Sequence, residues 1–335
     1  MDNPSDTPRQ SPADEALIRS ALTAEINQRL RSARITDGRA IIIAEAGDLS
    51  EAARAELEAE IAAKLGALPQ ITEVRVALMG ERRRRRLIAV GSGKGGVGKS
   101  TLTTNLAVAL AKTGRRVGVI DGDIYGPSQP KLLKTENIKP AATADGAKLI
   151  AIDSPYGVKV LSMGHIVAPG KALAWRGPMT GKALTQLIDA DWGDTEVLLI
   201  DLPPGTGDVQ LSMLSAHKPD GAVLVSTPQD LALIDAARAG QLFEQGDVPI
   251  IGLVENMAGY ACPHCGEVSD PFGSGGVEQF AGALDIPFMG RVPLTLATRM
   301  AGDRGEPPAA QDDDTAAPFH GIAQKLARWL DTGAI

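Results

Sequence analysis

The chain of 335 residues is 44% hydrophobic, 22% charged and 3% aromatic, which is typical of a folded globular protein with an aliphatic core. Its formal net charge of -7 argues against a general nucleic-acid surface, because phosphate binding depends on clustered Lys and Arg. Neither a secretory signal nor an apolar run of about 18 residues, the length of a membrane span, is visible, so we expect a cytoplasmic protein that binds neither nucleic acid nor membrane.

Residues 1–80 are predicted to form a small α/β domain with the order helix, strand, helix, strand. The opening helix begins near Asp14, and the strands are expected at Ala40–Ala44 and Ile71–Met79. Ser50 is a candidate cap for the second helix. That helix should bury one stripe of residues that recur every four positions, Leu57, Ile61 and Leu65.

An arginine-rich stretch at residues 81–86 separates this domain from the rest of the chain, and we place the boundary between Glu81 and Arg86. A run of like charges beside a predicted strand is typical of a solvated linker. Contact with RNA or a membrane is the alternative for this stretch.

In residues 87–335, apolar strands that end in Gly or Asp alternate with helices. This pattern predicts an α/β fold with a mostly parallel sheet covered by helices on both faces. The predicted strands are Leu87–Val90, Arg116–Ile120, Val158–Ser162, Val197–Ile200, Ala222–Ser226 and Pro249–Glu255. The segment Glu306–Pro318, rich in Pro and Asp, is predicted to be a surface loop before a closing helix at Phe319–Leu330.

A phosphate-binding loop is predicted at Gly93–Ser100, where the sequence matches GxxxxGK[ST] between an apolar strand and a helix expected at Ser100–Ala111. Its glycines would let backbone amides surround a phosphate, while Lys99 neutralises the phosphate charge and Ser100 supplies a hydroxyl ligand for Mg²⁺. The residues expected to contact the nucleotide here are Gly93, Lys94, Gly95, Gly96, Val97, Gly98, Lys99, Ser100 and Thr101. A chance glycine-rich turn is the alternative.

Lys94 is a second lysine that an ordinary phosphate loop does not need, and KGGVGKST resembles the deviant Walker A class of dimeric ATPases. The resemblance implies that Lys94 reaches across a dimer. There it would stabilise charge on the transferring phosphoryl group as an arginine finger does. A solvated surface lysine is the alternative.

Three aspartates follow predicted strands and should therefore lie at the carboxyl edge of the sheet, where α/β folds bind ligands. Asp201 suits the Walker B role of holding Mg²⁺ through its water shell. Asp123 is a candidate to orient the attacking water, as the same resemblance suggests. Asp121 is either part of this chemistry or a purely structural cap at the end of its strand.

Cys262 and Cys265, the only two cysteines, form a CxxC motif whose spacing lets two thiolates converge on one metal. In a reducing compartment we expect a metal or redox pair here rather than a structural disulfide. Four-thiolate sites need more ligands than one chain supplies, so the simplest complete site joins two such pairs across a homodimer. Spacing alone leaves open a shared [4Fe-4S] cluster, a shared Zn²⁺, a zinc knuckle that includes His264, and a thiol-disulfide pair.

Several stretches, taken in order, resemble the Mrp family of iron-sulfur carrier ATPases, also called ApbC in bacteria. They are GSGKGGVGKST, DGDIYGPSQPKLL, WRGPM at Trp175–Met179, DLPPGTGDVQLS, STPQDLALIDAARA, VENMAGYACPHCG, FGSGGVE, RVPL and DRGEP. The resemblance implies a homodimer that binds and hydrolyses ATP and bridges a [4Fe-4S] cluster through Cys262 and Cys265 of each subunit. It also implies that cluster donors load the protein, that apo-proteins receive the cluster, and that Asn256 reads the adenine.

The small first domain is similar in length and order to the iron-sulfur assembly domain that often precedes this ATPase. It contains no cysteine, and the acidic-proline signature usual near the first strand of that domain is not found here. We therefore expect it to act in docking or regulation rather than in direct cluster binding.

The main alternative function is a positioning ATPase of the MinD and ParA kind with a zinc-linked dimer, which would share Lys94, Lys99, Asp123 and Asp201. Such proteins cycle on a membrane or on DNA and therefore need a basic amphipathic helix or a basic patch, neither of which the sequence predicts. A zinc-dependent GTPase chaperone is disfavoured because no guanine-reading Asn/Thr-Lys-x-Asp motif is found.

Overall fold

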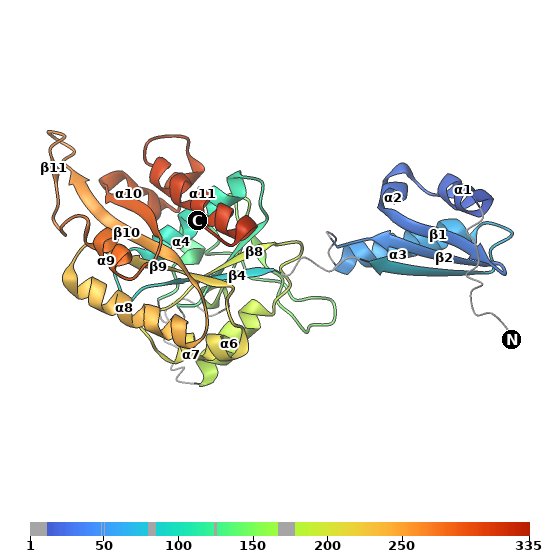
Figure 1. Cartoon of the computed structure of the whole chain (residues 1–335), viewed down its shortest axis with the longest axis horizontal. Coiled ribbons are helices and arrows are strands. Elements are labelled where there is room, and N and C mark those ends of the chain that lie inside the picture. The colour runs from blue at the N-terminus through green and yellow to red at the C-terminus, as the bar shows by residue number, and fades with distance from the viewer. Residues whose placement is uncertain (1–11, 48, 50, 80–84, 124–125, 167–177) are drawn as a thin grey trace. The chain divides into compact units, whose positions relative to one another are not determined.

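The computed structural model describes residues 12–335 apart from 48, 50, 80–84, 124–125 and 167–177. It divides into two compact units, Met1–Arg84 and Arg85–Ile335 (Figure 1). The predicted cap Ser50, most of the arginine run and residues 175–177 of the WRGPM motif lie outside the described residues. None of the helices that are described combines the length and the apolar character that a membrane span requires.

The smaller unit contains two short helices, one longer helix and a three-stranded sheet of order β1-β2-β3. Its elements are α1 (Pro12–Ala21), α2 (Ala24–Arg29), β1 (Leu30–Thr36), β2 (Arg39–Glu45), α3 (Glu51–Gly66) and β3 (Glu73–Met79). Strand β1 pairs antiparallel with β2, and β2 pairs parallel with β3. The buried stripe of Leu57, Ile61 and Leu65 on α3 is confirmed.

The predicted element order of the smaller unit lacked both the short helix α2 and the strand β1 and was therefore incomplete. Strands β1 and β2 are joined by a tight turn in which Asp37 has φ of 51° and Gly38 has φ of 75°. A two-residue turn with both central φ angles positive matches the right-handed twist of the strands that it joins, and Asp-Gly is a preferred sequence for it.

The larger unit alternates strands and helices along the chain. Its first elements are β4 (Arg86–Gly91), α4 (Lys99–Lys112), β5 (Val117–Asp121), α5 (Gln129–Leu132), β6 (Ile152–Asp153), β7 (Val158–Ser162), the 3₁₀ helix η1 (Met163–His165), α6 (Pro178–Ile188) and β8 (Val197–Asp201). They are followed by α7 (Asp208–Ala216), β9 (Gly221–Ser226), α8 (Asp230–Gln245), β10 (Ile250–Ala261), β11 (Val268–Ser269), α9 (Gly276–Ala283), β12 (Phe288–Leu294), α10 (Leu296–Arg304), the 3₁₀ helix η2 (Pro308–Ala310) and α11 (Ala317–Thr332).

A nine-stranded sheet of order β11-β10-β9-β4-β8-β5-β7-β6, with β12 beside β10, forms the centre of this unit. The central pairs are parallel, and β6 and β11 are antiparallel to their neighbours. Helices α4 and α11 pack on one face, and α6, α7, α8 and α9 pack on the other (Figure 1). Strands β5, β8 and β9 are buried at every residue, which explains their uninterrupted apolar sequences. The predicted fold class is confirmed.

All six strands predicted for this unit are present, although β10 continues past the predicted end at Glu255 to Ala261. The prediction of a surface loop at Glu306–Pro318 is wrong for its first part. Pro308 and Ala309 are buried, because η2 packs against α4 and the Ala309 N–H donates to Asn105 Oδ1 over 2.8 Å. An apolar Pro-Pro-Ala stretch can therefore be part of the core, while Gln311 and the three Asp residues that follow it are exposed.

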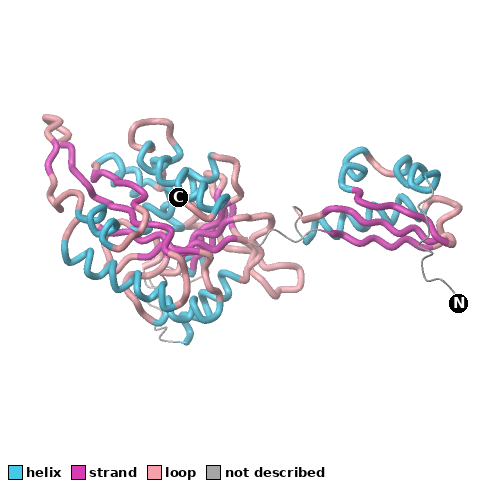
Figure 2. The backbone as a smooth tube through the Cα atoms, viewed as in Figure 1, coloured by secondary structure: helices cyan, strands magenta, loops and turns pink. Residues whose placement is uncertain are grey.

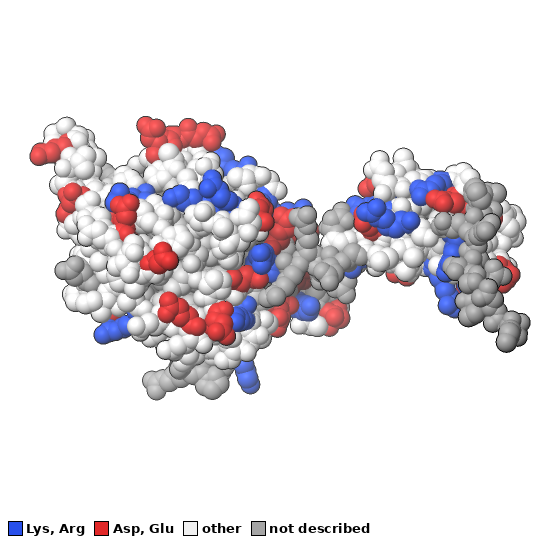
Figure 3. Space-filling model, in the orientation of Figure 1, with Lys and Arg blue, Asp and Glu red and all other residues white. Residues whose placement is uncertain are grey.

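Charges of both signs are interspersed on the face of the molecule seen in Figure 3. Several basic side chains of the larger unit form ion pairs with nearby carboxylates, such as Arg115 with Asp331 at 2.7 Å and Lys112 with Asp312 at 2.6 Å. Such pairs neutralise much of the local positive potential at the surface.

Candidate functional site

The predicted phosphate-binding loop connects the end of β4 to the start of α4. Gly96 and Gly98 have φ of 79° and 81°, a backbone conformation that side chains other than glycine rarely adopt. Gly93 has no such φ, but a Cβ there would lie 2.0 Å from the carbonyl carbon of Asp235, so α8 lies directly against the loop. Two different constraints therefore explain three of the four glycines of the loop: backbone conformation at Gly96 and Gly98, and close packing at Gly93.

Lys99 and Asp201 are brought together at the carboxyl edge of the sheet. The Lys99 ammonium donates to Asp201 Oδ1 and lies 3.4 Å from Ser100 Oγ. Both side chains of the ion pair are buried, with 7% and 0% of their surface exposed. Carboxylate and hydroxyl oxygens are hard ligands of the kind that Mg²⁺ prefers, so Ser100 and Asp201 fit a magnesium ion beside a bound phosphate.

Two buried side chains that the sequence reasoning missed complete the surroundings of Asp201. Thr103 on α4 donates to Oδ1 over 3.3 Å, and Gln129 at the start of α5 donates to Oδ2 over 2.9 Å. Gln129 lies within DGDIYGPSQPKLL, one of the stretches that carry the family resemblance, but the resemblance assigned it no role, and Thr103 lies in none of those stretches. Their role arises only when α4, α5 and the end of β8 meet in the fold.

Asp121 is buried at the end of β5 beside Asp201, its register neighbour on β8. Its Oδ2 accepts the N–H groups of Ser128 and Gln129 and the hydroxyl of Ser162, at 3.0 to 3.1 Å. Burial, together with the nearby Asp201 charge, raises the pKa of Asp121 to about 7. The structure thus gives Asp121 a structural part: it fixes the start of α5 to the end of β5.

Asp123 is half-buried two residues beyond the end of β5. Its Oδ1 accepts the N–H of Gly126 over 3.2 Å, and its own N–H lies 3.3 Å from Asp121 Oδ1. The carboxylate therefore caps its own loop and remains partly open to solvent, a position from which it could contact a water molecule.

Lys94 points away from the Lys99 and Asp201 pair. Its ammonium donates to Gln229 Oε1 over 3.0 Å, at the residue that precedes α8. The next residues of α8 expose large apolar side chains, with Leu231 73% and Ile234 51% exposed. Lys94 is thus held at an open, partly apolar face of the protein rather than inside its own phosphate loop.

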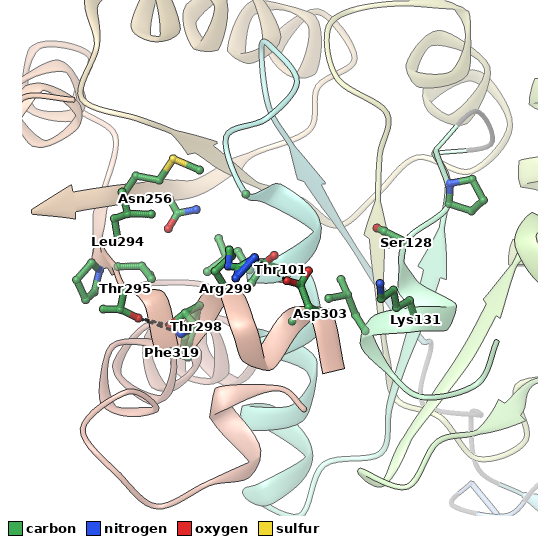
Figure 4. A pocket seen from close by; sticks show the side chains of 18 of the residues that line it. Thr101, Ser128, Lys131, Asn256, Leu294, Thr295, Thr298, Arg299, Asp303 and Phe319 are labelled. Atoms are coloured by element: carbon green, nitrogen blue, oxygen red, sulfur yellow. Dashed lines mark hydrogen bonds and ion pairs between the residues drawn. The ribbon is translucent and has the colours of Figure 1, made fainter. Parts of the chain in front are cut away.

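A cavity of about 460 Å³ opens beside Gly98 and Thr101 and is lined by α4, α5, α10, the middle of β10 and the end of β12. Figure 4 shows Asn256 and Leu294 on one side of this cavity, Ser128 and Lys131 on the other, and Thr101 and Arg299 between them. Asn256 is 9% exposed and donates from Nδ2 to the carbonyl of Val97 over 2.7 Å. The volume lies in the range of about 300–1,000 Å³ that is usual for small-molecule sites, and it suits a nucleoside whose phosphates reach the loop.

Glu255 precedes Asn256 on β10 and is fully buried, which the sequence reasoning did not foresee. It accepts the N–H groups of Gly275 and Val277 at the start of α9 and the side chain of Arg291 on β12, at 2.9 to 3.2 Å. This carboxylate therefore ties the FGSGGVE loop to β10 and β12, the two strands that line the cavity.

Cys262 and Cys265 lie in the loop between β10 and β11, at the tip of a hairpin that projects from the sheet (Figure 2). The Gly266 N–H donates to the Cys262 carbonyl over 2.9 Å, which closes the turn, and Cys265 is exposed. The N–H groups of Cys265 and then His264 favour the thiolate and lower the pKa of Cys262. The described residues contain no group of three or more His, Cys, Asp or Glu side chains that could hold a metal.

Comparison with known proteins gives consistent matches over the larger unit. A ParA family model described as the NUBPL iron-transfer P-loop NTPase matches residues 83–327. The iron-sulfur cluster carrier protein of Methanococcus maripaludis is 44% identical over 243 residues, which cover 71% of this chain and 83% of that protein. The nucleotide-binding protein of Archaeoglobus fulgidus, solved in complex with ADP, is 36% identical with a TM-score of 0.61 and covers 70% of this chain and 91% of its own. The cell division ATPase MinD of Pyrococcus furiosus shares the fold at 24% identity, with a TM-score of 0.55 over 72% of this chain and 98% of its own.

Proposed function

The chain belongs to the ParA family of NUBPL-type iron-transfer P-loop NTPases, and from this we propose that it binds and hydrolyses ATP and carries an iron-sulfur cluster to apo-proteins. One observation carries the proposal. The only two cysteines of the chain lie together at the open tip of a hairpin. The strand that leads into that tip, β10, also carries Asn256, which lines the cavity beside the phosphate-binding loop.

For ATP, we assign the triphosphate to the loop at Gly93–Thr101 and the base to the cavity beside Asn256. Lys99 would then exchange its bond to Asp201 for one to a phosphate oxygen, and Asp201 and Ser100 would face Mg²⁺, which neutralises phosphate charge during transfer. Asp123 would orient the attacking water from its half-buried position. The ion pair between Lys99 and Asp201 supports this assignment, because it already places a cation and a carboxylate side by side at the loop.

For the dimer, we assign the partner to the face that carries Lys94 and the start of α8. Lys94 is half-buried and bonded to Gln229, so a small change at α8 would redirect its ammonium toward a second copy. The exposed Leu231 and Ile234 would be buried there, which is favourable by about 25 cal/mol for each Å² of apolar surface removed from water. Hydrolysis would then require two docked copies, each supplying a cation to the other.

For the cluster, we assign Cys262 and Cys265 of each of two copies as the four thiolate ligands of a [4Fe-4S] cargo. The exposed hairpin tip suits a cluster that must be received from donors and passed on. The smaller unit has no cysteine, so we assign it docking or regulation rather than cluster binding.

The first experiment is a metal analysis of protein purified without oxygen or reconstituted with iron and sulfide. About four iron and four sulfide per dimer, with broad visible absorption near 400 nm, are expected from four shared thiolates. Cys262→Ser should lose the iron and sulfide and still bind ATP, because the described residues that line the nucleotide cavity include none from the hairpin tip. Full retention of iron and sulfide in that variant would rule out the bridging site.

The same measurement separates the second candidate, a MinD-like positioning ATPase with a zinc-linked dimer. Four thiolates suit zinc as well as iron, and the MinD fold is shared. Stoichiometric zinc, with no iron taken up on reconstitution, would favour that candidate and leave the ATPase assignment standing.

Hydrolysis is tested with Lys99→Ala, which should abolish ATP turnover and cluster transfer while cluster binding remains. A variant that still transfers its cluster to an apo-protein at the normal rate would contradict a transfer step driven by ATP.

Coupling between the two sites is tested by the reaction of the apo-protein with a thiol reagent, since its only cysteines are the CxxC pair. We expect Mg-ATP to change the rate of that reaction severalfold, because Asn256 is bonded to the phosphate loop and lies six residues before Cys262. Met257→Gly, which relieves a φ of 59° at the edge of the cavity on the side toward the hairpin, should alter this response. Asp247→Gly, which relieves a φ of 49° before β10 begins, should not. An identical rate with and without nucleotide would argue against coupling through β10.

A further inference from the structure

Gln129 is a buried side chain whose whole amide group is bonded to the nucleotide-binding machinery. It has 0% of its surface exposed. Its Nε2 donates to Asp201 Oδ2 over 2.9 Å and to the carbonyl of Ser100 over 3.1 Å, and its Oε1 accepts from Thr104 Oγ1 over 2.7 Å. Because the Ser100 carbonyl and Asp201 Oδ2 can only accept hydrogen bonds, the end of the amide that faces them must be the NH₂ group. A buried amide is stable only when its polar atoms are paired, and here they all are.

The two oxygens of Asp201 have different partners, and Gln129 is the partner of the second one. Oδ1 receives Lys99 and Thr103, both from α4. Among the hydrogen bonds of the described residues, Oδ2 receives Gln129 alone. The plane of this fully buried carboxylate is therefore set from α4 on one side and from α5 on the other.

Gln129 is also fixed by its backbone. Its N–H donates to Asp121 Oδ2 over 3.1 Å, beside the N–H of Ser128 at 3.0 Å. Asp121 ends β5, and the segment from Asp121 to Gln129 contains Asp123. The residue thus connects that segment to α4 and to the end of β8, elements that are distant in sequence.

We infer that Gln129 is a positioning residue that orients Asp201 toward a nucleotide-bound Mg²⁺ and couples its position to the segment that carries Asp123. The inference rests on the proposed function, in which Asp201 faces that ion. Without Gln129, the carboxylate loses the bond that holds Oδ2, so it can rotate toward Lys99 and face the ion less well. Binding of nucleotide without metal does not use this orientation and is left unchanged.

The test is the Mg²⁺ dependence of ADP binding by the full chain, measured by calorimetry for the native protein and for Gln129→Met, an unbranched apolar replacement of similar length. We expect the affinity for metal-free ADP to stay within twofold of the native value. The Mg²⁺ concentration that gives half of the metal-dependent tightening should rise about tenfold, the loss expected when one hydrogen bond to a charged group is removed. Direct titration with Mn²⁺ in the presence of ADP, followed by electron paramagnetic resonance, gives the same comparison without any turnover.

Thr104→Val is the matched control. It removes the hydroxyl that bonds Gln129 Oε1 and leaves the bond to Asp201 in place, so its Mg²⁺ requirement should change by less than threefold. If Gln129 and Thr104 only stabilised the fold, the Mg²⁺ requirement would instead change by a similar factor in both variants. If Gln129→Met does not fold by circular dichroism, Gln129→Leu takes its place.

A folded Gln129 variant with the native Mg²⁺ requirement would overturn the inference. If the native protein itself shows no Mg²⁺-dependent nucleotide binding, the proposed function fails instead, and the two results are therefore distinguishable.

Discussion

Replacing Gly93 with alanine tests whether α8 fixes the start of the phosphate-binding loop. An added Cβ would lie 2.0 Å from the carbonyl carbon and 2.2 Å from the carbonyl oxygen of Asp235. These are backbone atoms of a helix, so no side-chain rotation can relieve the overlap, and either the loop or α8 has to move. Gly95→Ala is the matched control in the same loop, because its Cβ would meet only Pro204, at an ordinary contact distance of 3.7 Å.

The expected magnitude follows from these contacts. Overpacking costs about 1–3 kcal/mol, and an overlap with backbone belongs at the upper end, about 3 kcal/mol. For a unit of this size, each kcal/mol lowers Tm by about 2–4 °C, so Gly93→Ala should melt about 6–12 °C lower than the native protein. Gly95→Ala should melt within about 2 °C of the native protein or slightly above it, since alanine restricts the unfolded chain where the native backbone accepts it.

The assay is thermal unfolding of both variants without nucleotide, followed by ATP turnover at a temperature where each is folded. Movement of α8 also displaces Gln229, the partner of Lys94, so Gly93→Ala should lose turnover beyond its loss of stability. Equal melting temperatures for the two alanine variants would refute the argument that close packing, rather than phosphate binding, requires glycine at position 93.

Three further predictions concern single side chains. Lys94→Ala should keep ATP binding, measured by calorimetry, and lose about 10³-fold in turnover if its ammonium acts as a cation supplied in trans; native turnover would leave it a surface lysine. Glu255→Ala leaves two backbone N–H groups and the Nε–H of Arg291 without their acceptor, while Arg291 keeps its bond to Glu278. The free energy of unfolding in urea should therefore fall by about 2–3 kcal/mol, and a fall below about 1 kcal/mol would contradict this role. Burial lowers the pKa of His165 to about 4; because the unfolded chain binds the proton more readily, native stability should fall as the pH drops from about 6.5 toward 4. His165→Asn should show a smaller fall over the same range in urea unfolding, and equal pH dependence of both proteins would contradict the assignment.

The strands of the larger unit could be predicted because parallel, doubly covered strands have continuous apolar sequences. Val158–Ser162 was predicted with the bounds that β7 has in the structure. Strand β12 could not be predicted in this way, since its burial alternates irregularly and it contains a proline. Strand β1 was missed although Asp37-Gly38 is a strong hairpin signal, because the residues before it alternate too weakly between apolar and polar.

In the candidate site, too, the features set by local sequence could be predicted, whereas the contacts between distant segments could not. The motif predicted where the phosphate loop begins, and the strand ends predicted that Asp121 and Asp201 lie at one edge of the sheet, where the structure has them as register neighbours. The bond from Gln129 to Asp201 joins residues 72 positions apart and depends on the packing of α5 against α4, which no local pattern specifies. The roles of Asp201 and Gln129 in catalysis and metal binding remain predictions, which the variants described above test.

Strand β10 offers a physical reason why one chain can link a nucleotide to a thiol pair. Up to Glu255 the strand is paired with β9 on one side and with β12 on the other, so this part is held by the sheet. Beyond Asn256 the register with β12 breaks until Tyr260, Met257 adopts a φ of 59°, and the pairing with β9 has ended. A base bound against Asn256 would therefore act at the point where the strand leaves the sheet. Fewer strand hydrogen bonds would oppose a displacement there, so we expect the hairpin that carries Cys262 to move with it.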